Sequence, residues 1–318
     1  MEINVTSFCF HERWNLFYFS TGEFSFVYDC GRDFIENSFG EEKNDEDYFY
    51  EVWNNLELVN WAKVDFILIS CHEQVHMLPL ITECTDFNGK VYITESAKEY
   101  SRYYLQEKLL IDKNRSLNAF DILLQMKILN TDSYDQTTFS EIFNTPNSIS
   151  LELIDDCFEK LTSVYYNTVF YPESFVKVHC KSSGYSIGSA NWSVEYKGKK
   201  IVLIGASSTV PGLHSQEFDK SIFNDAEICL VSSMQIPLID TPQPDTLKTF
   251  SQLFQQITSS IKLKGTSIIV CNPLGITYDL LEGINNHLNA SNIPGSQYWF
   301  VSPVAEKTIQ FGNIMGEW

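Results

Sequence analysis

The sequence predicts a mixed α/β protein, built as a layered sandwich that is followed by a smaller, Rossmann-like part. Apolar residues make up 44% of the 318 residues, which is enough for a buried core and excludes a disordered or fibrous chain. Strand-like apolar runs dominate the first two thirds of the chain. Beyond about residue 237, helical patterns alternate with apolar runs, as parallel βαβ units require.

The first part opens on strand signals. Strands over 16–20 and 24–28 are separated by a Thr-Gly-Glu turn, and the apolar run 64–70 is typical of a strand buried on both faces. A capping box formed by Ser96 and Glu99 predicts the start of a helix. The same criteria predict a helix over 150–162 and strands over 90–94, 175–180, 190–196, 200–204 and 227–232.

The second part begins after the proline-rich run 237–244, which predicts a linker. The patterns beyond it predict helices over 246–262, 277–289 and 304–315, with strands over 266–271 and 297–302 between them. The boundary between the two parts therefore falls near residue 237.

The charge of the chain limits its partners. Lys and Arg total 22 against 41 Asp and Glu, a formal charge of −19. Such a surface argues against binding led by nucleic-acid phosphates, which needs a basic footprint, and favours a basic protein partner or simple solubility. The most acidic run, 41–51, is interpreted as a solvated loop or as a contact for such a partner.

Cysteine usage and the N-terminus bear on the compartment. The eight cysteines are scattered without a CxxC pair, which disfavours zinc knuckles and thioredoxin-type chemistry. We see no leader peptide and no apolar run long enough to span a membrane. We therefore expect a reducing compartment, the cytosol or the nucleus.

Three short motifs spell well-known sites but lack the required context. Residues 72–76 read H-E-x-x-H, yet they follow a strand directly and are not expected in mid-helix, where a zinc protease needs them. Residues 184–188 read G-x-S-x-G, yet a strand pattern follows instead of a helix. The loop 205–208 lacks the Lys-Ser/Thr of a phosphate-binding loop.

Four loops, each after a predicted strand, carry the more specific signal. They are 29–31 (Asp-Cys-Gly), 71–79, 184–189 and 205–208, and the stretch 182–192 (SSGYSIGSANW) is the most specific part. Their order resembles the metallo-β-lactamase fold, and the βα part that follows resembles the β-CASP subgroup of nucleic-acid-processing proteins. The resemblance implies an αββα sandwich over residues 1–237, lacking its returning strands, and a partial β-CASP domain over 238–318.

The metal-ligand places of that family are altered here. The resemblance puts Cys71 and Glu73 at the first two places, with His72 between them, where active members carry H-x-H-x-D-H. Tyr185 stands at the next ligand place, where active members have a histidine. Ala206 stands at the place of the bridging Asp, and Ser232 at the place of the last acidic residue. Two dications need a shared anion, which alanine does not offer. We predict no catalytic residue and no cofactor, with Cys71, Glu73 and His76 as weak candidates for a single ion, and Asp29 as a brace of the loop.

The resemblance implies a non-catalytic role in RNA 3′-end processing. The expected partners are an active β-CASP endonuclease subunit of the same fold and a helical-repeat subunit, with RNA contacted only indirectly and no membrane. The expected location is the nucleus, with the cytoplasm as a second location. The chain itself is expected to be a truncated form whose open sandwich edge makes it depend on a partner.

Two other functions stay open at this point. One is an active metal-dependent hydrolase or ribonuclease with ligands rearranged around His72, Glu73 and His76. The other is an acidic interaction module unrelated to RNA.

Overall fold

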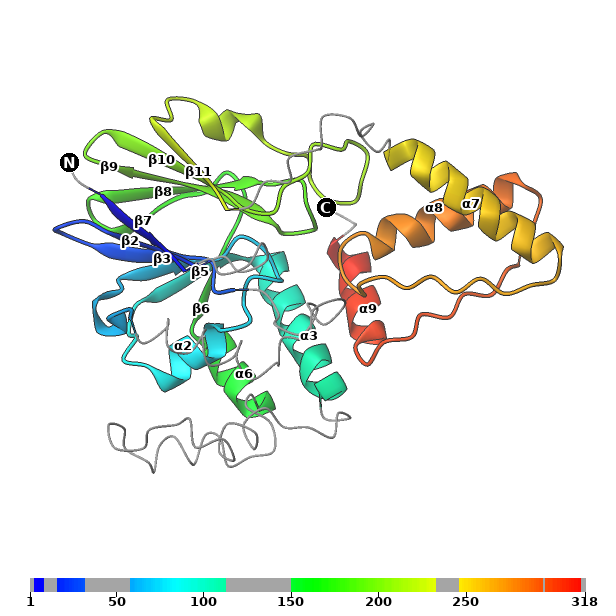
Figure 1. The fold of residues 1–318 in the computed structure, drawn as a ribbon, viewed down its shortest axis with the longest axis horizontal. Helices are drawn as coiled ribbons and strands as arrows, with labels where there is room; N and C mark the ends of the chain where they lie inside the picture. The colour runs from blue at the N-terminus through cyan, green and yellow to red at the C-terminus, as the bar shows by residue number, and fades with distance from the viewer. Residues whose placement is uncertain are drawn as a thin grey trace, which may run out of the picture.

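The computed structural model describes residues 3–8, 16–31, 58–112, 150–232 and 246–315, except residue 294. Two β-sheets lie face to face, helices cover the outer face of one of them, and a helical lobe stands at the side (Figure 1). The predicted α/β sandwich is thus confirmed. The expectations for the acidic run 41–51, for most of 113–150 and for the linker lie outside the described residues.

The first sheet contains six strands in the order β1-β2-β3-β4-β5-β6 among the described residues. β1 (Asn4–Ser7), β2 (Phe17–Ser20) and β3 (Ser25–Tyr28) pair antiparallel, whereas β4 (Phe66–Leu68), β5 (Lys90–Thr94) and β6 (Leu161–Val164) continue in parallel. The turn between β2 and β3 is held by Thr21, whose Oγ1 accepts from the N–H of Phe24 at 3.0 Å. The sequence did not predict β1 or β6.

The second sheet has the order β11-β10-β9-β8-β7 in the part of the chain that the structure describes. Its strands are β7 (Val169–Glu173), β8 (Val176–Ser182), β9 (Ala190–Tyr196), β10 (Lys199–Ile204) and β11 (Ile228–Val231), and β7 alone was not predicted. The 3-10 helix η3 (Lys220–Phe223) packs on its outer face, where Ile222 contacts Val202 and Ile204.

An aromatic core fills the space between the sheets. Phe26 lies between Phe19 and Phe66, with ring centroids 4.4 and 5.0 Å apart. From the second sheet, Trp192 is fully buried and its Nε1 donates to the carbonyl of Ile69 at 3.1 Å. Because this bond joins the two sheets, it fixes the start of β9 beside the loop that follows β4.

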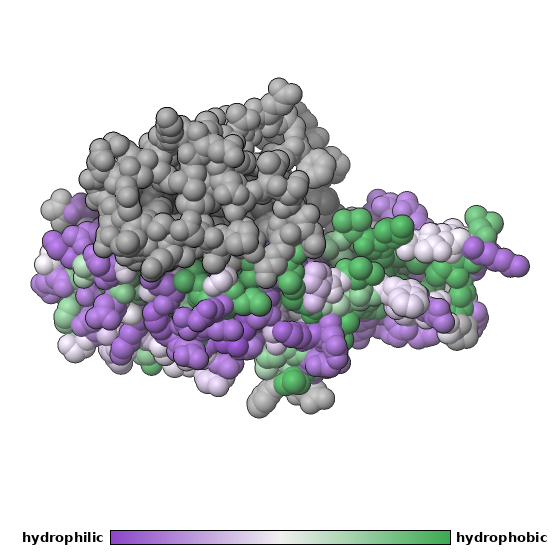
Figure 2. Space-filling view, turned by 90° about the horizontal axis from the view of Figure 1, so that it is seen from below, coloured by the Kyte–Doolittle hydropathy of each residue, from purple (hydrophilic) through white to green (hydrophobic). Residues whose placement is uncertain are grey.

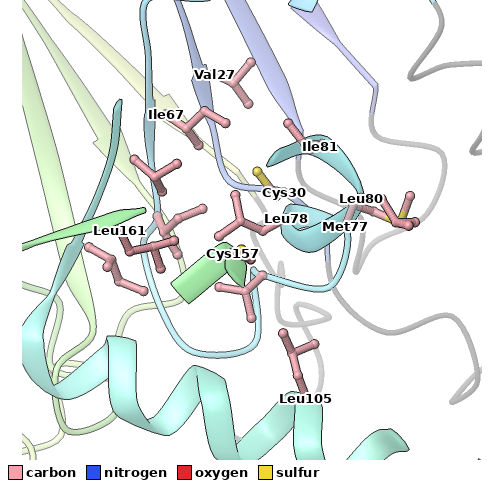
Figure 3. Packing of buried hydrophobic residues seen from close by; sticks show 14 of the residues in the cluster. Val27, Cys30, Ile67, Met77, Leu78, Leu80, Ile81, Leu105, Cys157 and Leu161 are labelled. Carbon is pink, nitrogen blue, oxygen red and sulfur yellow. The ribbon is translucent and has the colours of Figure 1, made fainter. Parts of the chain in front are cut away.

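A second core lies under the helices α2 (Leu78–Cys84), α3 (Glu95–Asp112) and α6 (Leu151–Glu159). Figure 3 shows Val27 and Ile67 of the first sheet facing Leu78 and Ile81 of α2. Since neighbouring residues of β4 point to opposite cores, the prediction of a strand buried on both faces is confirmed.

The start of α3 corrects the predicted capping box. The helix begins at Glu95, and the residue that caps it is Thr94, whose Oγ1 accepts from the N–H of Ala97 at 3.2 Å. The Ser96 hydroxyl contacts the Met315 sulfur of the last helix instead. Ser96 is therefore already inside the helix and serves to dock another element.

The C-terminal lobe comprises α7 (Thr246–Lys262), α8 (Thr277–Ala290) and α9 (Ala305–Met315), close to the three predicted helices. α7 and α8 share a small core around Ile257, Leu280 and Ile284. α9 lies alongside α3 (Figure 1). The predicted strands 266–271 and 297–302 are wrong: both segments are described without strand structure, and most of their apolar side chains are exposed.

None of the helices among the described residues is long and apolar enough to cross a membrane.

Candidate functional site

The loops that follow β3 and β4 are fastened together by one buried carboxyl group. Asp29 is fully buried, and its two oxygens accept from the N–H and the hydroxyl of Ser70 at 2.7 and 2.8 Å. Burial raises the pKa of Asp29 to about 8, although both bonds from Ser70 lower it. This geometry agrees with the bracing role expected for Asp29.

The H-E-x-x-H letters lie in a run of turns over residues 71–77, and α2 begins only at Leu78. His72 is buried, with its ring against Tyr100 and Tyr104 and its Nδ1 3.4 Å from the Ser186 hydroxyl. His76 uses its backbone N–H to bind the carbonyl of Gly31 at 3.2 Å. The helical spacing that lets two histidines share a metal in a zinc protease is therefore absent from these turns.

Two side chains at the family's metal-ligand places, Tyr185 and Glu73, are hydrogen-bonded to each other. The hydroxyl of Tyr185 donates to Glu73 Oε2 at 3.1 Å, across the gap between the loop after β4 and the loop after β8. The other oxygen of Glu73 accepts from the side-chain amide of Asn272 at 3.4 Å, and Asn272 belongs to the C-terminal lobe. Glu73 is only 3% exposed. It thus joins three segments that are far apart in the sequence.

The glycine-rich loop 183–189 is closed by its own serines. Ser189 Oγ accepts from the Ser186 N–H at 2.8 Å and donates to the Ser186 carbonyl at 2.7 Å. The Ser183 hydroxyl donates to Ser189 Oγ at 2.8 Å. β9 begins at Ala190, so a strand follows the turn where a nucleophile elbow needs a helix.

The loop after β10 lies beside this turn. Asn191 Oδ1 accepts from the Gly205 N–H at 3.1 Å, and its amide donates to Ser207 Oγ at 3.1 Å. Ala206 is half-buried between them, and the N–H of Ser232 bonds to the carbonyl of Ile204 at 2.9 Å. The structure therefore brings the loops that carry Ala206 and Ser232 to the same end of the second sheet.

The donors at these places do not fit a two-metal centre. They are one thiol (Cys71), one carboxyl group (Glu73), a phenol (Tyr185), a methyl group (Ala206) and a hydroxyl (Ser232). Across the described ranges, three or more His, Cys, Asp or Glu side chains do not gather where they could hold a metal ion. A pair of hydrolytic metal ions needs several such ligands and a bridging anion.

Sequence reasoning missed the contribution of the C-terminal lobe. Asn272 reaches Glu73 from 199 positions away. His214 Nδ1 lies 2.9 Å from Asp279 Oδ1, and its Nε2 lies 3.3 Å from Glu282 Oε2. A motif search has no signal for such contacts, because they depend on how the lobe packs.

Searches against known proteins give relatives but no family model: none matches this chain. Integrator complex subunit 9 of Xenopus laevis is 27% identical over 267 residues, which are 82% of this chain and 39% of that protein. Its homologue from Dictyostelium discoideum is 28% identical over 276 residues, 81% and 38% of the two chains. Cleavage and polyadenylation specificity factor subunit 3-I of Arabidopsis thaliana is 24% identical over 252 residues, which are 77% of this chain and 31% of that protein.

Solved structures also match at low identity. A mutant metallo-β-lactamase with a HARLDQ motif from Cronobacter sakazakii superposes with a TM-score of 0.38 at 10% identity, covering 91% of this chain and 92% of the other. Zinc-bound PqqB from Methylobacterium extorquens superposes with a TM-score of 0.36 at 10% identity, covering 69% of this chain and 59% of the other.

The chain spans about two fifths of the length of these two subunit 9 relatives. The order of its loop motifs and the sequence matches agree: the chain is similar to Integrator complex subunit 9 over about four fifths of its own length.

Proposed function

We propose that this chain is a non-catalytic scaffold subunit of an Integrator-type RNA cleavage assembly. The observation that carries the proposal is the hydrogen bond between Tyr185 and Glu73, two places at which active β-CASP nucleases hold metal. Both oxygens of this buried carboxyl group already accept a hydrogen bond from protein, one from a phenol and one from an amide. In this role the chain pairs with an active endonuclease subunit of the same fold and with a helical-repeat subunit.

The charge of the chain supports the same division of labour. A formal charge of −19 repels phosphates, so RNA contacts fall to another subunit that has the basic surface they need. The process would be 3′-end cleavage of small nuclear RNAs and attenuation of RNA polymerase II transcripts, which places the chain in the nucleus. The Integrator name of its relatives supports the assembly, and the sequence similarity to a cleavage and polyadenylation factor supports the chemistry of the process.

The test combines metal analysis with co-purification on one sample. We expect the purified chain to contain less than one zinc ion per molecule and to leave RNA uncut, with no change on chelation. Tagged chain is expected to recover the active endonuclease subunit from cells. The His76→Ala variant serves as the control for rearranged ligands, and it should behave as the unchanged chain does.

Two zinc ions per chain, together with RNA cleavage that chelation and His76→Ala both abolish, would overturn the proposal and establish the metal-dependent hydrolase. Recovery of basic partners without any nuclease would instead support the acidic interaction module.

A further inference from the structure

The segment 272–282 of the C-terminal lobe contacts the loops of the sandwich at two points. At the first, the Asn272 amide donates to Glu73 Oε1 at 3.4 Å. At the second, the backbone N–H of His214 donates to Asp279 Oδ1 at 2.8 Å, and the His214 ring lies within 3.3 Å of Glu282 Oε2. The segment 272–282, which includes the start of α8, thus touches the loop after β4 and the loop after β10.

The loops at these two points are themselves linked. The Ser215 hydroxyl donates to the Gly184 carbonyl at 2.9 Å, and the Ser208 N–H donates to the Ser183 carbonyl at 3.0 Å. The neighbouring residue, Tyr185, donates to Glu73. The contacts made by the lobe are therefore part of one network that runs through the glycine-rich loop.

Burial makes Glu73 the strongest point of this network. A buried carboxyl group is costly unless its oxygens are hydrogen-bonded. Removing a partner from Glu73 leaves a nearly inaccessible acceptor without one of its bonds. By contrast, Glu282 is well exposed, with 62% of its side chain accessible, so its pairing with His214 contributes less.

Apolar contacts continue the same interface. Leu274 is buried in the core under the helices of the sandwich, and Tyr278 and Phe311 pack against that core. The rings of Tyr100 on α3 and Phe311 on α9 are 5.0 Å apart, edge to face. These apolar contacts position the lobe against the sandwich, whereas the hydrogen bonds of Glu73 and His214 hold the segment 272–282 against the loops.

We propose that the segment 272–282 is a latch that holds the C-terminal lobe closed over the loop edge of the sandwich, with Glu73 as its buried anchor. The inference rests on the proposed function in one respect: Glu73 holds the lobe in place of a metal ion. Its consequence is a fixed angle between lobe and sandwich, so that a partner meets one rigid surface.

Asn272→Asp tests the latch on the full chain, because it sets a second carboxyl group against Glu73 with little change in size. We expect hydrogen exchange of the backbone amides in 272–282 to become about tenfold faster or more, because a hydrogen bond to a buried carboxyl group is lost. The double variant Asn272→Asp/His214→Ala should exchange these amides faster still, and its radius of gyration in X-ray scattering should be larger than that of the unchanged chain. Asn285→Asp is the matched control: it makes the same change at an exposed position of α8, and exchange in 272–282 should stay as in the unchanged chain.

Tyr185→Phe provides a second test if Asn272→Asp fails to fold, because it removes only the hydroxyl that binds Glu73. We expect hydrogen exchange of the same amides to become several-fold faster in this variant. Unchanged exchange in the folded variants would overturn the latch. Zinc analysis of the same samples separates the two proposals. Two zinc ions in the unchanged chain contradict the non-catalytic role. If the unchanged chain holds no zinc and the substitutions leave hydrogen exchange in 272–282 unchanged, only the latch is contradicted.

Discussion

Single buried residues determine how the loops of the site are held, and Asp29 shows it most clearly. Its carboxyl group is fully buried and accepts two hydrogen bonds from Ser70, but burial outweighs this hydrogen bonding and raises the pKa of Asp29 to about 8. The sequence indicated the bracing role through the family resemblance. It could not indicate the pKa, which depends on how completely the two sheets exclude water.

Asp29 should make the stability of the chain fall as the pH rises from about 4 to about 8. In that range the folded state keeps a proton that the unfolded state releases, so the free energy of unfolding decreases by up to about 1.4 kcal/mol per pH unit. Asp29→Asn preserves an acceptor for the Ser70 N–H and removes the titration. Urea unfolding between pH 5 and 8 should give a flatter pH dependence for this variant, and identical slopes for both proteins would contradict the assignment.

At the scale of elements, the close fit of the glycine-rich loop accounts for its specific sequence. Gly184 has a φ of +71°, and a Cβ placed on it would lie 2.1 Å from the Ser208 carbonyl oxygen. Gly198, in the turn between β9 and β10, has a similar φ of +76° but open space around it. Both need a conformation that favours glycine, and only the first is also packed against backbone.

Gly184→Ala should therefore destabilise the chain much more than Gly198→Ala. Left-handed strain alone costs about 1 kcal/mol, and overpacking against a backbone oxygen adds about 1–3 kcal/mol. Thermal unfolding of the two variants measures the difference, with Gly198→Ala as the control for strain. Equal losses would mean that the loop after β10 moves away freely.

The helices were predicted better than the edges of the sheets for a physical reason. α7 and α9 carry their periodicity in their own sequence, whereas β1, β6 and β7 are short segments that become strands by pairing with a neighbour. The opposite error occurred at 266–271 and 297–302, where the sequence has strand propensity but the described residues offer no pairing strand. Strand propensity reflects packing on a half-buried surface, and it has no effect where that surface is missing.

At the scale of the whole molecule, the lobe exposes an apolar surface. Figure 2 shows green side chains gathered on the side of the molecule where the lobe lies. Among the most exposed are Val270 at 94%, Val301 at 90% and Ile268 at 88%. The segments 266–271 and 297–302 contain no charged residue, and uncharged apolar segments of this length associate readily.

We expect the isolated chain to self-associate as its concentration rises, despite its charge, and the double variant Val270→Lys/Val301→Lys to reduce this. The lysines break both uncharged segments. Light scattering over a concentration series measures the effect. Leu263→Lys/Ile314→Lys adds the same charge at exposed apolar positions of the lobe outside the two segments, and it should reduce association less. Equal effects of the two variants would assign the association to net charge alone.

The sequence by itself determined the α/β class, most strands of both sheets, the helices of the lobe and the altered character of Cys71, Glu73, Tyr185, Ala206 and Ser232. The class, the strands and the helices follow from local periodicity and turn chemistry, which are properties of short segments, and the altered character of the five places follows from the family resemblance. Only the tertiary structure decided that Tyr185 and Asn272 both bind Glu73 and that Asp279 meets His214. Those bonds join residues between 65 and 199 positions apart, and such contacts exist only once the loops and the lobe have packed.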